Sequence, residues 1–438
     1  MRTSLTLPLT LCALACDYGN AAGDTGNGVT ETVRPGVVDC TDNVCVLTGT
    51  YTEDLQLTPD NVYLLRGGVF IGDDENPTTM HIDAGVRIYG ETSTDGMLVI
   101  RRHANIMAMG TAEAPIVMTS SKEPGLRARG DWGGLIINGR APINSCASKQ
   151  PTDCEAFGEG GAGYYGGDDS DDSSGVLNYL RIEFAGTLVS PDNELNGIAF
   201  QGVGAGTVID YVQVHMNADD GIEFFGGTAN AKHVVISGAG DDSLDWTDGW
   251  QGQGQFIIVQ QHDDSGDNGI EADNNGDNNV AAPVSMPTLS NMTLLGSPDS
   301  ESSDIGLLIR EGTGVHVLNT VVKGFNESCI DIDNDATFAN ISGGDLSFSH
   351  TVVDCGTSFQ VDEDDVTDVG AFFLSGEGNF VGAADVIDPY NLTEPNFAPS
   401  APIQGGVAPE AEFFDAVDYL GAIGSDDWTV GWTDYPAN

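Results

Sequence analysis

Four short segments of the chain carry the same arrangement of acidic and apolar residues: 217–227 (NADDGIEFFGG), 240–246 (GDDSLDW), 266–273 (GDNGIEAD) and 327–333 (ESCIDID). Each one follows a short apolar stretch that is typical of a β-strand, such as residues 208–214 (VIDYVQV) before the first segment. The repeat therefore joins a strand to an acidic turn, and it predicts that both features recur along the structure.

These segments recur at a nearly constant spacing. Gly221 and Ser243 occupy equivalent positions 22 residues apart, and Gly306 and Ser328 are again 22 residues apart. A polar excursion over residues 274–287 explains the longer interval before Gly306. A fixed short period indicates a solenoid, in which each repeat packs on its neighbours and the surface repeats together with the core.

The period and the many short apolar stretches predict an all-β fold, a parallel β-helix over residues 46–375. Each coil would supply two or three short strands with Val, Ile, Leu and Phe inward, and its bends would use Gly, Asn or Asp. A further excursion is expected at residues 145–174. Because the ends of a β-helix expose strand edges, we expect the C-terminal extension, residues 376–438, to cap the last coil. The aromatic residues assigned to that cap, within residues 405–438, are Phe413, Phe414, Trp428 and Trp432.

The chain is strongly acidic. Its 438 residues include 67 Asp and Glu but only 15 Lys and Arg, which gives a formal net charge of −52. Such a field repels nucleic acid and anionic membrane surfaces and attracts cations. We therefore expect no nucleic-acid partner. The charge does not by itself establish metal binding, because a secreted or salt-adapted surface has the same composition.

The N-terminus has the features of an export signal. Arg2 precedes a short apolar run at residues 5–15 that is too short to span a bilayer. The run ends in Ala-Leu-Ala before Cys16, which resembles a bacterial lipobox. Leu is the more usual residue three positions before the cysteine, where this chain has Ala13. The resemblance implies a signal peptide over residues 1–16 and lipidation of Cys16. The alternative is ordinary secretion after cleavage at a small residue. A flexible tether is expected at residues 17–45.

Six cysteines remain outside the signal region. They lie as near neighbours in three pairs: Cys40 and Cys45, Cys146 and Cys154, and Cys329 and Cys355. Six cysteines allow fifteen disulfide connectivities, and proximity in sequence favours these three in an exported protein. Zinc is the alternative, but the chain has no CxxC motif and only 7 His.

Several long runs resemble a family of exported bacterial proteins. The runs are residues 130–144 (GDWGGLIINGRAPIN), 164–186 (YYGGDDSDDSSGVLNYLRIEFAG), 196–260 (NGIAFQG…QFIIVQ) and 419–435 (YLGAIGSDDWTVGWTDY). The resemblance implies a right-handed, single-stranded parallel β-helix of the pectin-lyase-like kind. It implies no particular activity, because none is assigned to the family.

Carboxylates are the residues that the repeat would stack. In a parallel β-helix, equivalent residues of adjacent coils lie about 4.8 Å apart, so columns of Asp and Glu repel unless a cation neutralises them. Ca²⁺ suits such a site because it accepts six to eight oxygen ligands. The alternative is that these residues only shape turns in water. The candidate ligands are Asp220, Glu223, Asp242, Asp245, Asp267 and Glu271.

A catalytic interpretation of the same turns is also available. Asn217-Ala218-Asp219 and Gly240-Asp241-Asp242 resemble the NxD and GDD motifs of polygalacturonase-type hydrolases. That resemblance implies an inverting glycoside hydrolase that uses Asp219, Asp241 and Asp242. The downstream GHG and RIK motifs of those enzymes are replaced by Gln-His-Asp around His262 and by Ile-Arg-Glu around Arg310. The DD pair also recurs simply because the coil recurs.

Other chemistry finds less support in the residues. A lyase needs a basic residue beside calcium, and only Lys232, Arg310 and Lys323 lie near the acidic turns. An anionic polyuronate would also meet the negative field of the protein. Trp246 and Trp250 flank an acidic turn, where they would either stack on sugar rings or cover a loop.

The preferred interpretation is an exported β-helix protein of the cell envelope that binds Ca²⁺. It would be an outer-membrane or surface lipoprotein, or otherwise secreted, with a lipid anchor as its sole membrane attachment. We expect a monomer that acts as a surface scaffold or as a module that binds a polysaccharide or an envelope protein. The alternative is the inverting glycoside hydrolase.

Overall fold

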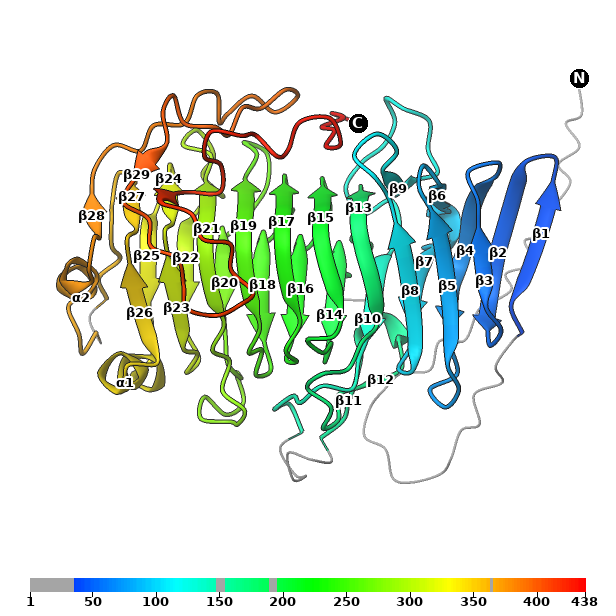
Figure 1. Ribbon diagram of the computed structural model, residues 1–438, viewed down its shortest axis with the longest axis horizontal. Helices are drawn as coiled ribbons and strands as arrows, with labels where there is room; N and C mark the ends of the chain where they lie inside the picture. The colour runs from blue at the N-terminus through cyan, green and yellow to red at the C-terminus, as the bar shows by residue number, and fades with distance from the viewer. Residues whose placement is uncertain (1–34, 147–153, 189–194, 363–364) are drawn as a thin grey trace, which may run out of the picture. The chain divides into compact units, whose positions relative to one another are not determined.

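The strands of this protein stack as successive coils of a parallel β-helix (Figure 1). The computed structural model describes residues 35–146, 154–188, 195–362 and 365–438. Within them, 26 strands form one continuous sheet, and every pair in it is parallel except the pair between β1 (Val37–Thr41) and β2 (Val44–Tyr51). The predicted β-helix is therefore confirmed.

The pairing divides the coils into three faces, which we call A, B and C. Face A contains β7 (Met97–Ile100), β10 (Gly134–Asn138), β14 (Ile198–Gln201), β16 (Ile222–Phe225), β18 (Leu244–Thr247), β20 (Ile270–Ala272), β22 (Ile305–Ile309) and β25 (Ser328–Ile332). Face B contains β3 (Leu55–Leu57), β5 (Thr78–Asp83), β8 (Ala104–Met109), β23 (Val315–Leu318) and β26 (Leu346–Ser349). Face C contains β6 (Arg87–Gly90), β9 (Ile116–Ser120), β24 (Val321–Lys323), β27 (Val352–Asp354) and β28 (Phe380–Val381).

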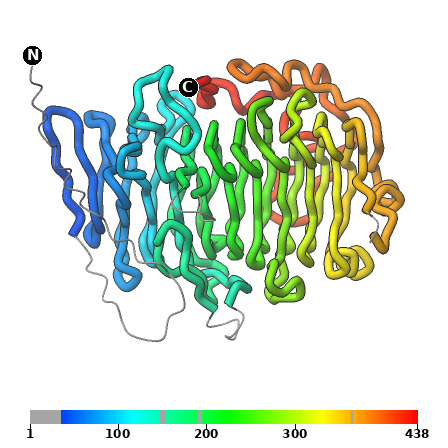
Figure 2. The backbone as a smooth tube through the Cα atoms, turned by 180° about the vertical axis from the view of Figure 1, so that it is seen from behind, coloured from blue at the N-terminus to red at the C-terminus, as the bar shows by residue number. Residues whose placement is uncertain are grey.

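The longer strands each contribute to two faces. Faces B and C are joined through β13 (Gly175–Glu183), β15 (Val208–His215), β17 (Asn230–Ser237), β19 (Gln253–Gln260) and β21 (Thr288–Leu295). Faces C and A are joined through β2 and β4 (Val62–Ile71). The tube in Figure 2 shows the same stack from behind.

Inward side chains of the three faces form one apolar core, as the alternating pattern predicts. Phe200, Phe224 and Trp250 stack on successive coils, with ring centroids 5.0 Å and 4.1 Å apart. Trp246 is also fully buried and donates a hydrogen bond to the Thr313 hydroxyl. Both tryptophans of the acidic turn are therefore core residues, and neither offers a face to a sugar.

The bend between faces B and C departs from the expectation of Gly, Asn or Asp. Tyr179, Tyr211, His233 and Phe256 all adopt positive φ there, between 48° and 58°. Their rings stack along the coils with centroid separations of 4.3, 4.2 and 5.0 Å. Each aromatic pair contributes about 0.5–1.5 kcal/mol beyond burial, which offsets a left-handed backbone cost of about 1–2 kcal/mol. Side-chain stacking therefore decides the residue type at this bend.

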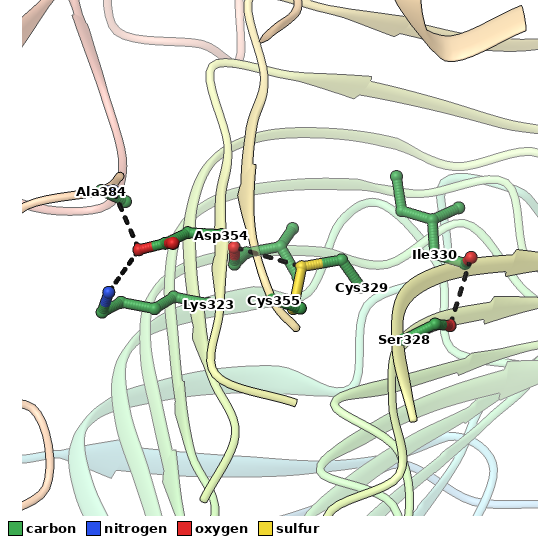
Figure 3. Close-up of a disulfide and its surroundings, with 8 residues drawn as sticks. Lys323, Ser328, Cys329, Ile330, Asp354, Cys355 and Ala384 are labelled. Carbon is green, nitrogen blue, oxygen red and sulfur yellow. Dashed lines mark hydrogen bonds and ion pairs between the residues drawn. A yellow bond between two sulfur atoms is a disulfide. The ribbon is translucent and has the colours of Figure 1, made fainter. Parts of the chain in front are cut away.

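All three predicted disulfides are present. The Cα atoms are 4.0 Å apart in Cys40–Cys45, 5.3 Å apart in Cys146–Cys154 and 5.6 Å apart in Cys329–Cys355. Figure 3 shows the third bridge, beside the ion pair of Lys323 with Asp354. It ties a face A strand to the segment that follows β27. Disulfides are typical of proteins outside the reducing cytosol.

One boundary differs from that expected. Residues 37–45 lie in or between paired strands, so they belong to the sheet and are not a tether. The signal segment and Cys16 lie outside the described residues. None of the helices in the described part of the chain is long and apolar enough to cross a membrane.

The C-terminal extension covers the last coil only through β28, which pairs with β27 at that end. That end is covered by α1 (Asp335–Gly343) and α2 (Val369–Ser375), whose Phe373 packs against Phe348 and Phe359. Residues 403–438, including β29 (Ile403–Gln404) and β30 (Tyr419–Leu420), instead run back along face C (Figure 1).

Outward residues of face C bind this extension coil by coil. The Thr293 hydroxyl accepts a hydrogen bond from the Ala422 N–H, and the Gln213 side chain bonds both main-chain groups of Asp434. Between them, the apolar side chains of Val235 and Ile258 pack in one cluster with Trp432. The apolar outward positions of face C are thus explained by a covering segment of the same chain.

Replacing Trp432 with Ala should destabilise the protein by about 3 kcal/mol, because the side chain is 1% exposed and its removal leaves a cavity on face C. Val430→Ala is the matched control, since Val430 is 73% exposed and should change stability by less than about 0.5 kcal/mol. Urea unfolding of the two variants measures the difference. Equal stability would show that the extension does not pack on face C.

Candidate functional site

The outward residues of face A change from apolar to acidic along one column. Val99, Ile136 and Ala199 pair in register on β7, β10 and β14. The next strands place Glu223 beside Ala199 and Asp245 beside Glu223, and then Glu271 beside Asp245. The parallel register therefore stacks three carboxylates on consecutive coils, as the repeat predicts.

Two more acidic columns lie in the turn that precedes these strands. Asp220 and Asp242 come three residues before Glu223 and Asp245, and the Asp220 Oδ1 accepts the Asp242 N–H at 3.0 Å. The Asp242 Oδ1 accepts the Asn268 N–H at 2.6 Å in the same way. These two aspartates therefore have a structural role, because they hold the turns of adjacent coils together. The outer column contains Asp219, Asp241, Asp267 and Asp304.

The columns bring carboxylates within the coordination range of a single cation. In three groups, one ligand atom from each residue lies within 4.8 Å of the others. The groups are Asp220 with Glu223 and Asp245, Asp219 with Asp220 and Asp241, and Asp241 with Asp242 and Asp267. Five of the six predicted ligands are therefore found in such groups, and the first group contains three of them.

Burial makes these carboxylates difficult to ionise together. Asp220 and Glu223 are each 8% exposed and Asp242 is 5% exposed. Burial, and then the charge of neighbouring carboxylates, raises the pKa of each well above its usual range. The pKa of Asp245 is raised for the same reasons, with Glu271 as its strongest neighbour. The site is built to take up positive charge, as protons or as a metal ion.

Glu271, the sixth predicted ligand, has a different partner. It forms an ion pair with Arg310, which also contacts Asp273 at 3.0 Å. Arg310 lies one coil further along, two residues after Leu308, the residue that pairs with Glu271. The guanidinium thus neutralises the end of the column. In the described part of the chain, no Lys, Arg or His forms an ion pair with Asp220, Glu223 or Asp245.

Asn196 joins the group and was missed in the sequence. It is 2% exposed, and its Nδ2 donates to the Glu223 Oε2 at 2.6 Å. Its Oδ1 is buried and has no hydrogen-bond partner. Gly197 N–H bonds the Asp220 carbonyl, which places Asn196 one coil before Asp220 in the same column. That register was the available signal, but an amide does not match the carboxylates expected of a calcium site.

The three candidate catalytic residues do not come together as one set. Asp219 and Asp241 share a group with Asp220, whereas Asp242 belongs to a group with Asp241 and Asp267. Carboxyl groups of inverting glycosidases stand about 6.5–9.5 Å apart to admit water, whereas Asp241 offers an oxygen within 4.8 Å of Asp219 and one within 4.8 Å of Asp242. His262, at the position of the missing histidine motif, is 5% exposed and lies beside His215 with ring centroids 6.0 Å apart.

Comparison with known families agrees with the fold. The pectate-lyase-like beta helix domain matches residues 49–394, and the protein belongs to that family. Comparisons with curated proteins and with solved structures gave no significant match. Membership confirms the pectin-lyase-like resemblance of the sequence. Export and lipidation remain predictions.

Without metal, the protein should become less stable as pH rises from about 4.5 to 7.5. A carboxyl whose pKa is higher in the folded chain contributes stability at low pH and loses it as pH rises through the folded value. The pKa is raised to about 6 in Asp267 and about 7 in Glu271 and Asp331, and burial also raises the pKa of Asp220 and Glu223 well above the usual range. Each such carboxyl lowers the free energy of unfolding by up to about 1.4 kcal/mol per pH unit.

Thermal unfolding in chelator across this range measures the effect. Glu223→Gln should flatten the slope, because the amide does not titrate. Asp263→Asn, at an exposed turn, is the control and should leave the slope unchanged. Stability that stays level or rises between pH 4.5 and 7.5 would contradict the assignment.

Proposed function

We propose that this protein is an exported, calcium-stabilised β-helix that serves as a surface scaffold of the cell envelope. One observation carries the calcium assignment. Asp220, Glu223 and Asp245 converge at a buried position where Asn196 adds an unpartnered oxygen and no basic side chain of the described residues forms an ion pair. A divalent cation supplies the charge that this arrangement lacks.

The donor atoms select the kind of cation. The group offers carboxylate and amide oxygens, whereas zinc prefers His nitrogen and Cys sulfur. All six cysteines outside the signal region are engaged in disulfides. Calcium accepts up to eight oxygens in irregular geometry, and magnesium requires a smaller, near-octahedral set and retains water. Calcium is therefore the cation that best suits this buried group of carboxylate and amide oxygens.

A scaffold fits the geometry better than a hydrolase. The acidic side chains hold adjacent coils together through main-chain hydrogen bonds, and Asp219, Asp241 and Asp242 do not converge in one group. A long sheet of stacked coils offers an extended surface to a polysaccharide or an envelope protein. The predicted export signal, the disulfides and the net charge of −52 support a place outside the cytosol.

Calcium should raise the melting temperature of the protein because it binds only the folded state. At a concentration 100 times the dissociation constant, one site contributes about 2.7 kcal/mol, which corresponds to several degrees. Replacing Asp220 with Asn and Asp245 with Asn together should abolish the shift. Differential scanning calorimetry with calcium and with chelator measures it.

The matched control removes the same charge elsewhere. Asp263→Asn with Asp299→Asn changes two exposed aspartates and should keep the calcium shift. A calcium shift that survives the Asp220 and Asp245 changes would contradict this site. Reducing-end release from a panel of polygalacturonan and neutral glycans, lost in Asp241→Asn, would favour the hydrolase instead.

The lipid anchor has its own test. Because Cys16 would carry the lipid, Cys16→Ala should move the protein from the membrane fraction to the soluble fraction of the host cell. Immunoblots of the two fractions measure the distribution. Retention of the variant in the membrane fraction would rule out an anchor at Cys16. A wild-type protein found only in the medium would indicate ordinary secretion instead.

A further inference from the structure

The excursion after Cys154 lies against face A beside the carboxylates. It forms a hairpin of β11 (Ala156–Phe157) and β12 (Tyr164–Tyr165) around η3 (Glu159–Gly161). Ala162 packs in one cluster with Ile136 and Ala199, and its carbonyl accepts the Asn138 Nδ2 at 3.0 Å. Ala199 is the register partner of Glu223. The excursion therefore covers the last apolar position of the column that becomes acidic at Glu223.

Glu159 begins η3, the part of the hairpin that meets this end of the column. The next residue, Gly160, lies so close to Leu195 that an added Cβ would stand 2.8 Å from its Cδ2. Leu195 directly precedes Asn196, the residue whose amide bonds Glu223. The Oε2 of Glu159 is buried and has no hydrogen-bond partner.

Electrostatics agrees with this placement. Burial raises the pKa of Glu159 to about 7, with a further contribution from the charge of Asp248. Glu159 is also one of the charges that raise the pKa of Glu223, after burial, Asp245 and Asp220. The other acidic residue of the hairpin, Glu155, is exposed and pairs with Arg102 at 2.5 Å. The two glutamates of one hairpin thus have opposite surroundings.

We propose that Glu159 is a further ligand of the cation held by Asp220, Glu223 and Asp245, so that calcium ties the hairpin to the β-helix. This inference rests on the proposed calcium site. A second observation supports a ligand there: Asn196 is 2% exposed, its amide touches Glu223, and its Oδ1 has no partner. Two buried oxygens without partners therefore belong to residues that interact with Glu223, Asn196 through a hydrogen bond and Glu159 through its charge.

The hairpin carries two exposed aromatic side chains. Phe157 is 63% exposed and Tyr164 is 50% exposed, and their rings meet edge to face with centroids 5.3 Å apart. Such an aromatic pair on an acidic surface is suited to contact a partner. A cation bound through Glu159 fixes the position of this pair.

Hydrogen–deuterium exchange of the full-length protein tests the inference. Calcium should slow exchange in a peptide that spans residues 155–166 by at least about tenfold relative to chelator, because opening the hairpin must release a metal ligand. Glu159→Gln should lose this protection and keep a calcium-dependent rise in melting temperature. Glu155→Gln is the matched control on the same hairpin and should retain the protection.

The outcomes separate this inference from the calcium site itself. Calcium that stabilises the protein but leaves exchange in the hairpin unchanged would overturn the role of Glu159 and leave the calcium site standing. Equal protection in Glu159→Gln and wild type would overturn it as well. Absence of any calcium effect on melting temperature in the wild type would overturn both proposals.

Discussion

Parallel stacking places each side chain of a coil directly over its counterpart, about 4.8 Å away. Every feature of this protein depends on that constraint. Inward, it stacks Phe200 on its register partner Phe224 within the apolar core. At the bend of faces B and C, it stacks aromatic rings so well that they hold a left-handed backbone. On face A, the same register stacks carboxylates, where proximity is unfavourable.

The repulsion between the stacked carboxylates of face A determines the chemistry of the site. At about 4.8 Å and an effective dielectric constant of about 20, two carboxylates repel by about 3.5 kcal/mol. The chain shows two ways to meet this cost: raised pKa values at Asp220 and Glu223, and the guanidinium of Arg310 at Glu271. A bound cation is the third. It would also give a partner to the buried oxygens of Asn196 and Glu159, which have no hydrogen bond.

The fold was predictable because its signal is periodic. A 22-residue interval, an acidic turn after each strand and the close cysteine pairs are all local features, and the coils and disulfides follow them. The C-terminal extension was not predictable, because its position depends on contacts such as Gln213 with Asp434, more than 200 residues apart in sequence. Aromatic residues in that segment indicated burial, but not which face they cover.

The site was predictable to the extent that it repeats. Asp220, Glu223 and Asp245 follow from the period, and the structure groups them. Glu271 fits the same period, yet Arg310 pairs with it, and the sequence did not show which coil would carry the basic residue. Glu159 lies in an excursion outside the repeat, so only the folded hairpin reveals it. Asn196 shares the register, but as an amide in an acidic column it did not match the expected ligand type.

A crystal structure of the full-length protein grown in millimolar calcium, with anomalous diffraction data, tests the central claim most directly. The account predicts an anomalous peak on face A, with oxygens of Asp220, Glu223, Asp245 and Glu159 at about 2.3–2.6 Å. Face A carboxyl groups that bond only to water or to one another, with no anomalous peak between them, would contradict it.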